Sequence, residues 1–232
     1  MSVLYAVLFG MVSAVAAYSA MQSFGWHSVF LMSISVCFAS LAVGYSFDTP
    51  RVFQKRDNGQ LPMHIYFIFW PYLVMNALAF NLFRASARHR PWDEIAPGLF
   101  LGRRVIESDR NAINALKINS VLDLTCEFNE TEFMRNASRY ACIPVLDTRA
   151  PKMDELKEGV EFIKEGLSSG AVYVHCALGH GRSATFVAAY LLSMSQVKNI
   201  DEALTVIRNA RPGIRVSLSQ RALLEQYANL KS

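Results

Sequence analysis

Long apolar runs that contain no Asp, Glu, Lys or Arg dominate the first third of the chain. Three such runs can be delimited, at Val3–Met21, Trp26–Phe47 and Leu61–Phe83. Each has 19 or more residues, and about 20 consecutive apolar residues form a helix that spans the hydrocarbon core of a bilayer. The pattern therefore predicts a membrane region of two or three hydrophobic α-helices over residues 1–83.

The first run differs from a cleavable signal peptide at its start. It has no basic residues before its apolar core, although "AYSAMQS" at its end offers the small residues of a cleavage site. We interpret Val3–Met21 as a span that is retained, with a cleaved signal peptide as the alternative.

Basic residues flank the third run on both sides. Arg51, Lys55 and Arg56 precede it, and Arg84, Arg88 and Arg90 follow it. Because Lys and Arg concentrate in cytoplasmic loops, a third span would leave one of these clusters on the disfavoured side. The run also contains prolines and asparagines, which suit a kinked, re-entrant or interfacial segment as well as a span.

Several membrane topologies therefore stay open. Two spans plus a re-entrant segment, or three spans with the N-terminus outside, place the rest of the chain in the cytoplasm. Three spans with the N-terminus inside place it outside. We favour an integral membrane protein with a cytoplasmic C-terminal domain, because the three cysteines after the membrane region do not form the even-numbered disulfide framework that is typical of oxidising compartments.

After the membrane region, the apolar residues follow the patterns of short strands and amphipathic helices. We assign residues 84–94 to a basic linker and residues 95–232 to one α/β domain. Strand-like runs read "LFLGR", "SVLDLT", "YACIPVLD" and "AVYVHC", and the clearest helix reads "MDELKEGVEFIKEGL". Strands that alternate with helices predict a central, mostly parallel sheet flanked by helices.

The net charge of +4 belongs to residues 1–90, that is, to the membrane region and the first part of the basic linker. Residues 1–90 hold six basic and two acidic residues, whereas residues 91–232 hold 17 of each. The second part therefore gives no support to nucleic-acid binding through a basic face. The basic clusters beside the apolar runs, in contrast, are suited to contact with anionic lipid.

One stretch carries candidate chemistry, "VYVHCALGHGRSATF" at Val172–Phe186. Cys176 stands where an apolar strand ends and a helix begins, and the free N–H groups of a helix N-terminus bind anions. Gly179 and Gly181 allow the backbone between them to turn its amides inward as an anion-binding nest. Arg182 offers a planar fork to phosphate oxygens, and its charge favours a thiolate. These features indicate phosphoryl transfer to sulfur, against the alternative of a buried core cysteine beside an ordinary turn.

The motif "HCALGHGRSA" resembles the signature loop of the cysteine-dependent phosphatases, and specifically of the compact dual-specificity group in the protein tyrosine phosphatase superfamily. The resemblance covers about residues 95–227 and implies a dual-specificity-phosphatase-like domain in which Cys176 forms a cysteinyl-phosphate. It implies that Ser183 assists the breakdown of that intermediate and that His175 supports the loop from behind. It implies no metal and no cofactor. The implied phosphate-binding loop consists of Ala177, Leu178, Gly179, His180, Gly181 and Arg182.

The resemblance also implies a general acid on a mobile loop that precedes the cysteine. Asp147, in "IPVLDTRAP", lies 29 residues before Cys176 and follows a strand-like run. Asp123, in "VLDLT", and Asp154, at an expected helix N-cap, are rivals that have structural explanations of their own. Near the C-terminus, "RPGIRVSLSQRALL" is similar to a family segment that buttresses the loop, so Arg211 is expected to be structural.

The substrate is less well defined by the sequence. The five residues between Cys176 and Arg182 contain no Lys or Arg, which related phosphoinositide and phosphatidylglycerophosphate phosphatases usually carry there, and only His180 could add charge. This departure favours phosphotyrosine, with phosphoserine and phosphothreonine in addition, in proteins at the membrane. A membrane anchor, however, places the site beside lipid head groups. A phospholipid head-group phosphatase is therefore the alternative.

A catalytically idle phosphate-binding module or membrane scaffold is a third, remote hypothesis. Such a module would be expected to have lost at least one of its catalytic residues, and the sequence retains Cys176, Arg182, Ser183 and Asp147. The acids and the phenylalanine in "TCEFNET" either line the substrate cleft or form a solvated loop, and we expect the solvated loop. The sequence leaves the oligomeric state undefined.

Overall fold

The computed structural model describes residues 2–86 and 90–230. By its internal contacts the chain forms two compact units. The helical unit comprises Met1–Lys55 and Leu61–Ser86, and the α/β unit comprises Arg56–Gln60 and Ala87–Ser232. Arg88, which belongs to the predicted basic linker, lies outside the described residues.

The helical unit contains α1 (Ser2–Met21), α2 (Trp26–Ser46), the 3₁₀ turn η1 (Pro50–Phe53) and α3 (Met63–Ser86). These three α-helices are long and apolar enough to cross a membrane. Their outward-facing side chains are largely apolar, as expected of helices that face lipid rather than water.

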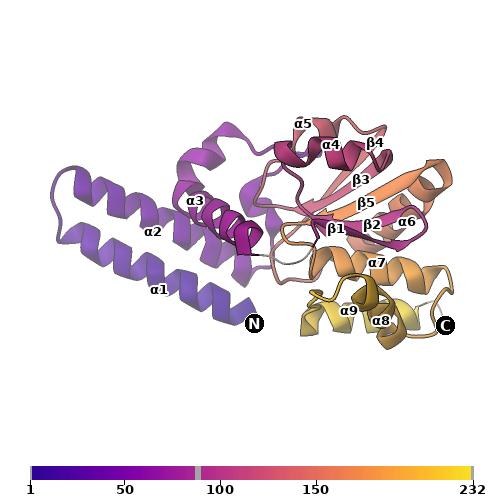
Figure 1. The fold of residues 1–232 in the computed structure, drawn as a ribbon. Coiled ribbons are helices and arrows are strands. Elements are labelled where there is room, and N and C mark those ends of the chain that lie inside the picture. The colour runs from indigo at the N-terminus through magenta and orange to yellow at the C-terminus, as the bar shows by residue number, and fades with distance from the viewer. Residues whose placement is uncertain (1, 87–89, 231–232) are drawn as a thin grey trace. The chain divides into compact units, whose positions relative to one another are not determined.

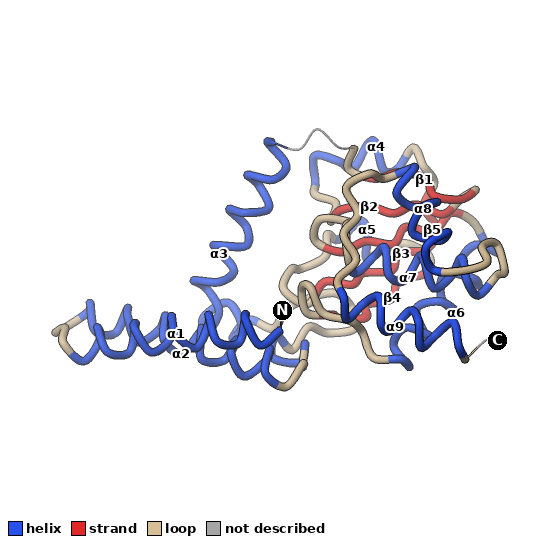
Figure 2. Tube along the Cα trace, turned by 90° about the horizontal axis from the view of Figure 1, so that it is seen from below, coloured by secondary structure: helices blue, strands red, loops and turns tan. Residues whose placement is uncertain are grey.

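Packing within the helical unit joins α1 to α2 along their length (Figure 1). The Phe9 ring lies 5.7 Å from the Phe38 ring and 5.4 Å from the Tyr45 ring. The Ser13 hydroxyl donates to the Ser35 carbonyl at 2.9 Å, a bond that satisfies a polar group in apolar surroundings. In contrast, α3 runs obliquely to the α1–α2 pair (Figure 2).

The α/β unit is built on one five-stranded sheet of order β1-β2-β5-β3-β4. Its strands are β1 (Trp92–Ala96), β2 (Leu99–Arg103), β3 (Ile118–Thr125), β4 (Arg139–Val145) and β5 (Ala171–Cys176). The pairs β2–β5, β3–β5 and β3–β4 are parallel, and the edge strand β1 is antiparallel to β2. The prediction of a mostly parallel sheet is confirmed.

Helices cover both faces of this sheet. The main core lies between the sheet and the helices α6 (Met153–Ser169), α7 (Arg182–Ser193), α8 (Ile200–Ala210) and α9 (Leu218–Asn229). A smaller core lies on the opposite face, beneath η2 (Glu107–Asp109), α4 (Arg110–Asn114) and α5 (Glu132–Arg135). Side chains of β5 alternate between the two, since Val174 belongs to the main core and Tyr173 to the smaller one.

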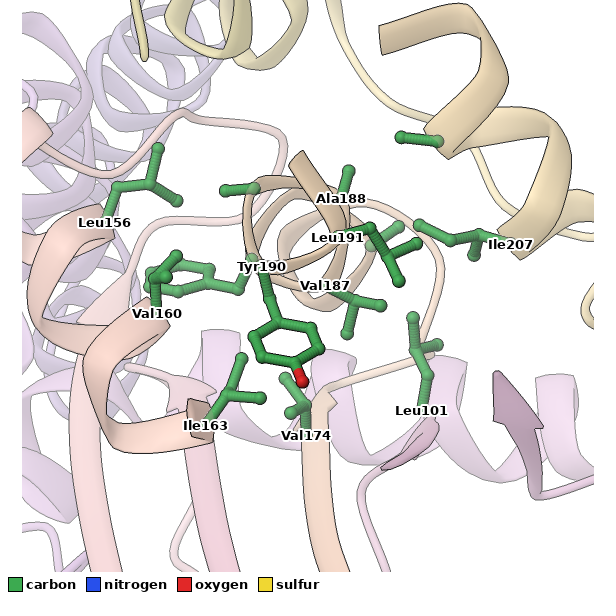
Figure 3. Packing of buried hydrophobic residues seen from close by; sticks show 14 of the residues in the cluster. Leu101, Leu156, Val160, Ile163, Val174, Val187, Ala188, Tyr190, Leu191 and Ile207 are labelled. Carbon is green, nitrogen blue, oxygen red and sulfur yellow. The ribbon is translucent and has the colours of Figure 1, made fainter. Parts of the chain in front are cut away.

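Helix α7 lies at the centre of the main core (Figure 3). Every residue from Arg182 to Leu191 is buried. Phe186 packs so closely on α6 that a Cβ atom added to Gly159 would lie 2.3 Å from its ring. This packing fixes the start of α7, and therefore the position of the loop that precedes it.

The strand β1 lies in a stretch that the sequence pattern does not predict to be a strand. Residues 92–94 fall in the predicted linker, because "PWDEI" combines a proline with two acids. The strand forms because it needs only one partner, β2, and its side chains are half-buried or exposed. The boundaries 1–83, 84–94 and 95–232 stay a prediction.

Replacing Phe186 by Ala should lower the free energy of unfolding of the α/β unit by about 3–5 kcal/mol, the usual cost of a large core cavity. Urea unfolding of the full-length protein in detergent micelles measures this loss through the fluorescence of Trp92, after Trp26 and Trp70 are replaced by Phe. Leu218→Ala is the matched control, because Leu218 is 82% exposed and should change stability by no more than about 0.5 kcal/mol.

Candidate active site

Cys176 is the last residue of β5, and α7 begins at Arg182. The five residues between them form a loop at the carboxyl end of a central parallel strand, the edge where α/β sheets bind ligands. The first turn of α7 leaves its N–H groups facing that loop, and they favour an anion. The sequence therefore places a thiol and a helix N-terminus at one point.

The loop conformation depends on glycine and on buried arginine. Gly179 has φ +71°, and a Cβ atom there would lie 2.4 Å from the backbone of Gly102. Arg211 is 2% exposed, and its guanidinium donates to the carbonyls of Gly179 at 2.7 Å and Leu178 at 3.1 Å. These bonds direct the carbonyls of Leu178 and Gly179 toward Arg211, an arrangement that suits a nest of loop amides facing an anion. The expectation that Arg211 is structural agrees with this geometry.

Arg182 is 1% exposed, and its charge is balanced inside the protein. Its guanidinium donates to both oxygens of Glu127, at 2.7 and 3.0 Å, and to the Val145 carbonyl at 2.8 Å. Burial alone would raise the pKa of Glu127, but the charge and hydrogen bonds of Arg182 outweigh it and lower that pKa. Among the described residues the buried Nε–H of Arg182 meets no hydrogen-bond acceptor. One donor of the fork is therefore available to a ligand.

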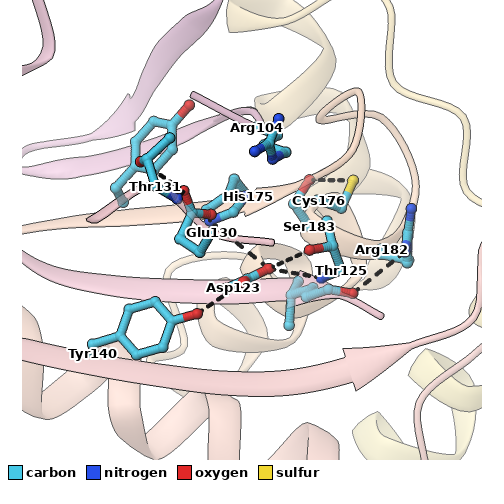
Figure 4. Close-up of polar contacts among 12 residues, drawn as sticks. Arg104, Asp123, Thr125, Glu130, Thr131, Tyr140, His175, Cys176, Arg182 and Ser183 are labelled. Carbon is cyan, nitrogen blue, oxygen red and sulfur yellow. Dashed lines mark hydrogen bonds and ion pairs between the residues drawn. The ribbon is translucent and has the colours of Figure 1, made fainter. Parts of the chain in front are cut away.

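The Cys176 thiol is 3% exposed and lies 3.5 Å from the Ser183 hydroxyl (Figure 4). Burial alone would raise the pKa of this thiol. The Arg182 charge and hydrogen bonds from Ser183 and the His180 amide outweigh burial, so the pKa of Cys176 is lowered from its ordinary value. A lowered pKa increases the thiolate fraction near neutral pH, and the thiolate is the nucleophilic form.

Asp147 follows β4 and comes to the same place. Its carboxylate lies 3.1 Å from the guanidinium of Arg182, and its side chain is 59% exposed. The structure therefore brings together the four residues that the sequence selected, Cys176, Arg182, Ser183 and Asp147. The rivals lie elsewhere: Asp123 is fully buried within β3, and Asp154 is in the exposed first turn of α6.

A second polar cluster lies behind the loop, on the opposite face of the sheet (Figure 4). His175 faces Glu130, with Nε2 and a carboxylate oxygen 3.0 Å apart, and both side chains are fully buried. Asp123 accepts hydrogen bonds from the Thr125 hydroxyl at 2.7 Å and from the Tyr140 hydroxyl at 2.8 Å. Burial, together with Asp123, raises the pKa of Tyr140, so that its hydroxyl stays a donor.

Asp123, Glu130 and His175 are also near enough to one another to hold a metal ion, with one ligand atom from each within 4.8 Å. Three of their four carboxylate oxygens, however, already accept bonds from neighbouring donors: both oxygens of Asp123, and Oε1 of Glu130, which receives the Thr131 amide at 2.6 Å. We therefore interpret the cluster as support for His175, the residue that precedes the nucleophile.

The expectation that the acids of "TCEFNET" form a solvated loop is wrong. Glu127 and Glu130 are each 4% exposed, because each is the partner of a buried cation or histidine on a neighbouring element. The segment lies between β3 and α5, beside the end of β5. Because this segment directly follows the strand-like run "VLDLT", the sequence could have suggested that it lies at the carboxyl edge of the sheet, beside the loop that follows Cys176.

His180, in that loop, packs against Gly213: its ring would lie 3.0 Å from a Cβ atom added to Gly213.

The family described as the dual specificity phosphatase catalytic domain matches residues 99–230. The chain belongs to this family. Solved structures agree: human tyrosine phosphatase-like serine/threonine/tyrosine-interacting protein superposes with a TM-score of 0.56 at 26% identity, over 62% of this chain and 99% of that one. The PTPMT1 structure in complex with PI(5)P gives 0.53 at 24% identity, over 61% and 96%, which shows the fold alone. The family and fold predicted from the motif are confirmed.

Curated relatives of this chain include phosphatases of two kinds. The phosphatidylglycerophosphate phosphatase PTPMT1 of Arabidopsis thaliana is 32% identical over 71% of this chain, and human phosphatidylglycerophosphatase and protein-tyrosine phosphatase 1 is 31% identical over 67%. Human dual specificity protein phosphatase 1 is 31% identical over 58%. These matches span 49%, 84% and 36% of the respective relatives, so this chain spans about half the length of the Arabidopsis protein. They confirm the prediction of a phosphoric monoester hydrolase.

Replacing Ser183 by Ala should raise the pKa of the Cys176 thiol, because a hydrogen bond that favours the thiolate is lost while burial still opposes the charge. The measurement is the rate of Cys176 alkylation by iodoacetamide against pH, whose midpoint should move to higher pH. Ser193→Ala, at the other end of α7, is the control and should leave the midpoint in place. An unmoved midpoint in Ser183→Ala would show that this hydroxyl does not stabilise the thiolate.

Proposed function

We propose that this protein is a membrane-anchored phosphatase that transfers the phosphoryl group of a phosphomonoester to Cys176 and then to water. The observation that carries the proposal is a buried thiol of lowered pKa, at the N-terminus of α7 and beside Arg182. The proposal includes the domain organisation predicted from the sequence: a membrane region, a basic linker and a catalytic domain. The catalytic domain lies on the cytoplasmic face of the membrane.

In the first step the Cys176 thiolate attacks phosphorus. The S–P bond forms as the bond from phosphorus to the leaving oxygen breaks. The loop amides and the free Nε–H of Arg182 hold the equatorial oxygens, whose charge they stabilise in the transition state. Asp147, which is exposed and next to Arg182, gives its proton to the leaving oxygen as a general acid.

In the second step water attacks the cysteinyl-phosphate. Asp147, now ionised, accepts a proton from that water, the S–P bond breaks, and inorganic phosphate leaves with the thiolate restored. The Ser183 hydroxyl donates to the sulfur as negative charge returns to it, which assists its departure. His175 acts as a positioning residue, because its ring is held by Glu130 behind the loop.

Phosphotyrosine in proteins at the membrane, with phosphoserine and phosphothreonine in addition, is the first candidate substrate. The loop from Ala177 to Gly181 contains no Lys or Arg, and its His180 packs against Gly213. The site therefore offers the charge needed for one phosphate, held by Arg182 and the loop amides, and no loop Lys or Arg for a second one.

The phosphate of a phospholipid head group is the second candidate, and the comparisons support it about as well. The phosphatidylglycerophosphate phosphatases match 67–71% of this chain, whereas human dual specificity protein phosphatase 1 matches 58%. The similarity to the lipid enzymes thus covers more of the chain. Three helices that are long and apolar enough to cross a membrane would bring the site to such substrates.

Asp147→Asn should lower kcat by about 10²–10⁴-fold, the usual contribution of a general acid. The loss should be larger for phenyl phosphate than for p-nitrophenyl phosphate, because the poorer leaving group depends more on protonation. Asp154→Asn is the matched control and should keep full activity. Equal losses on both substrates would contradict the role of Asp147 as the acid.

Turnover in lipid nanodiscs distinguishes the two substrates. Phosphate release from phosphotyrosine peptides is compared with release from phosphatidylglycerophosphate and phosphoinositides, with the Cys176→Ser variant as the blank. Higher kcat/KM on the peptides supports the protein-phosphatase candidate, and higher kcat/KM on a lipid supports the other. Release that persists in Cys176→Ser would overturn the proposed mechanism itself.

A further inference from the structure

A short turn between the second and third apolar helices belongs to the α/β unit, although its neighbours in sequence belong to the helical unit. This turn, Arg56–Gln60, is closed by its own backbone. The Gly59 amide donates to the Arg56 carbonyl at 2.8 Å, and the Arg56 amide donates to the Gln60 carbonyl at 2.9 Å. It is therefore a compact structure and not an extended connection.

The turn has a fitted place on the α/β unit. The Glu130 amide donates to the Gly59 carbonyl at 2.9 Å. Gly59 is buried with φ +76°, and a Cβ atom there would lie 2.1 Å from the Tyr140 hydroxyl and 3.0 Å from Cβ of Glu130. Since any side chain at Gly59 would collide with Tyr140, the fit is specific to glycine.

Helix α3 is consequently joined to the α/β unit at both of its ends. It begins at Met63, three positions after Gln60, and ends at Ser86, six positions before Trp92 of β1. Six residues reach at most about 20 Å when fully extended, less than the hydrocarbon core of about 30 Å. A folded domain lies on one side of a membrane, so neither connection can pass through the bilayer.

We propose that α3 is a re-entrant segment, which enters and leaves the membrane on the face where the α/β unit lies. Of the three apolar helices in the described part of the chain, α1 and α2 then cross the bilayer and α3 does not. The N-terminus lies on the same side as the α/β unit, and the turn at residues 22–25 lies on the opposite side. With its 24 residues α3 is long enough to span, but its two attachments forbid it.

The contacts of α3 within the helical unit fit this path. Pro71 lies inside the helix, where a proline removes a hydrogen bond and favours a bend. On either side of it, the Trp70 indole donates to the Ser33 hydroxyl at 3.3 Å and the Tyr72 ring lies 6.1 Å from the Phe9 ring. The segment around Pro71 thus contacts both α1, at Phe9, and α2, at Ser33.

The exposed side of α3 is mainly apolar, as a segment within lipid requires, and exposed polar residues such as His64 and Asn81 lie toward the two ends of the helix. Phe67, Val74, Leu78 and Leu82 are each at least 51% exposed. At 100° per residue these positions lie on one face of the helix. The opposite face is buried and includes Ile65.

The charge distribution agrees independently. Three basic residues precede the third apolar run and three follow it, whereas residues 22–25 hold none. A re-entrant α3 places both clusters on one face of the membrane. That arrangement removes the conflict with the preference of Lys and Arg for cytoplasmic loops, which a third span would create.

Labelling of single cysteines in sealed, oriented vesicles tests the proposal. The four native cysteines are replaced, and Cys is introduced at Asp57, Ser86, Gln22 or, as the reference on α6 of the α/β unit, Lys157. All four positions are exposed. A membrane-impermeant maleimide should label D57C, S86C and K157C from the same face and Q22C only from the other. Labelling in detergent confirms that each thiol can react.

Labelling of D57C and S86C from opposite faces would overturn the proposal, because α3 would then cross. Labelling of Q22C from the same face as K157C would also overturn it, since α1 and α2 would not cross. If the cysteine-free chain does not fold, trypsin digestion of the unaltered protein in the same vesicles replaces the labelling experiment. Cleavage at the basic residues on both sides of α3 should occur from one face only. Neither readout depends on phosphatase activity, so the proposed function is tested separately.

Discussion

The ion pair between Arg182 and Glu127 is the interaction on which the candidate site depends. A guanidinium that is almost fully buried is costly unless its charge is balanced and its donors are bonded. Glu127 supplies that balance from the end of β3, while Arg182 begins α7. The pair therefore fixes two elements of the fold together. It also orients the fork so that its Nε–H meets no acceptor among the described residues, and this is the donor that we propose for a phosphate.

The strand β5 separates chemistry from support by the alternation of its side chains. Cys176 belongs to the main core, beneath α7, whereas His175 faces the buried cluster of Asp123 and Glu130. A pleated strand gives adjacent residues opposite faces, so "HC" at its end delivers one residue to each. The proposed nucleophile is thus held through its neighbour by contacts on the other face of the sheet. The turn at Arg56–Gln60 packs against that supporting cluster, by the bond from Glu130 to Gly59.

The sequence predicted those parts that local patterns determine. The alternation of strand-like runs with helical patterns such as that of α6 predicted the α/β class. The residue types of the loop after β5 predicted a site at Cys176, and Asp147, selected by its spacing, lies beside Arg182. Strand β1 escaped prediction because an edge strand needs no continuous apolar run. The burial of Glu127 was not predicted either, because an acid beside a strand is expected to be solvated unless a cationic partner for it is known. That partner, Arg182, lies 55 residues further along the chain.

The short connection from Ser86 to Trp92 would make the enzyme meet its substrate in the two dimensions of the membrane surface and not in the three dimensions of the solution. A catalytic domain held within about 20 Å of an embedded helix samples a thin layer above the bilayer instead of the whole solution. Encounters then follow lateral diffusion, and the relevant concentration is the number of phosphate groups per unit of membrane area. Diluting a membrane-bound substrate with inert lipid would slow such an enzyme even when the amount of substrate in the sample stays constant.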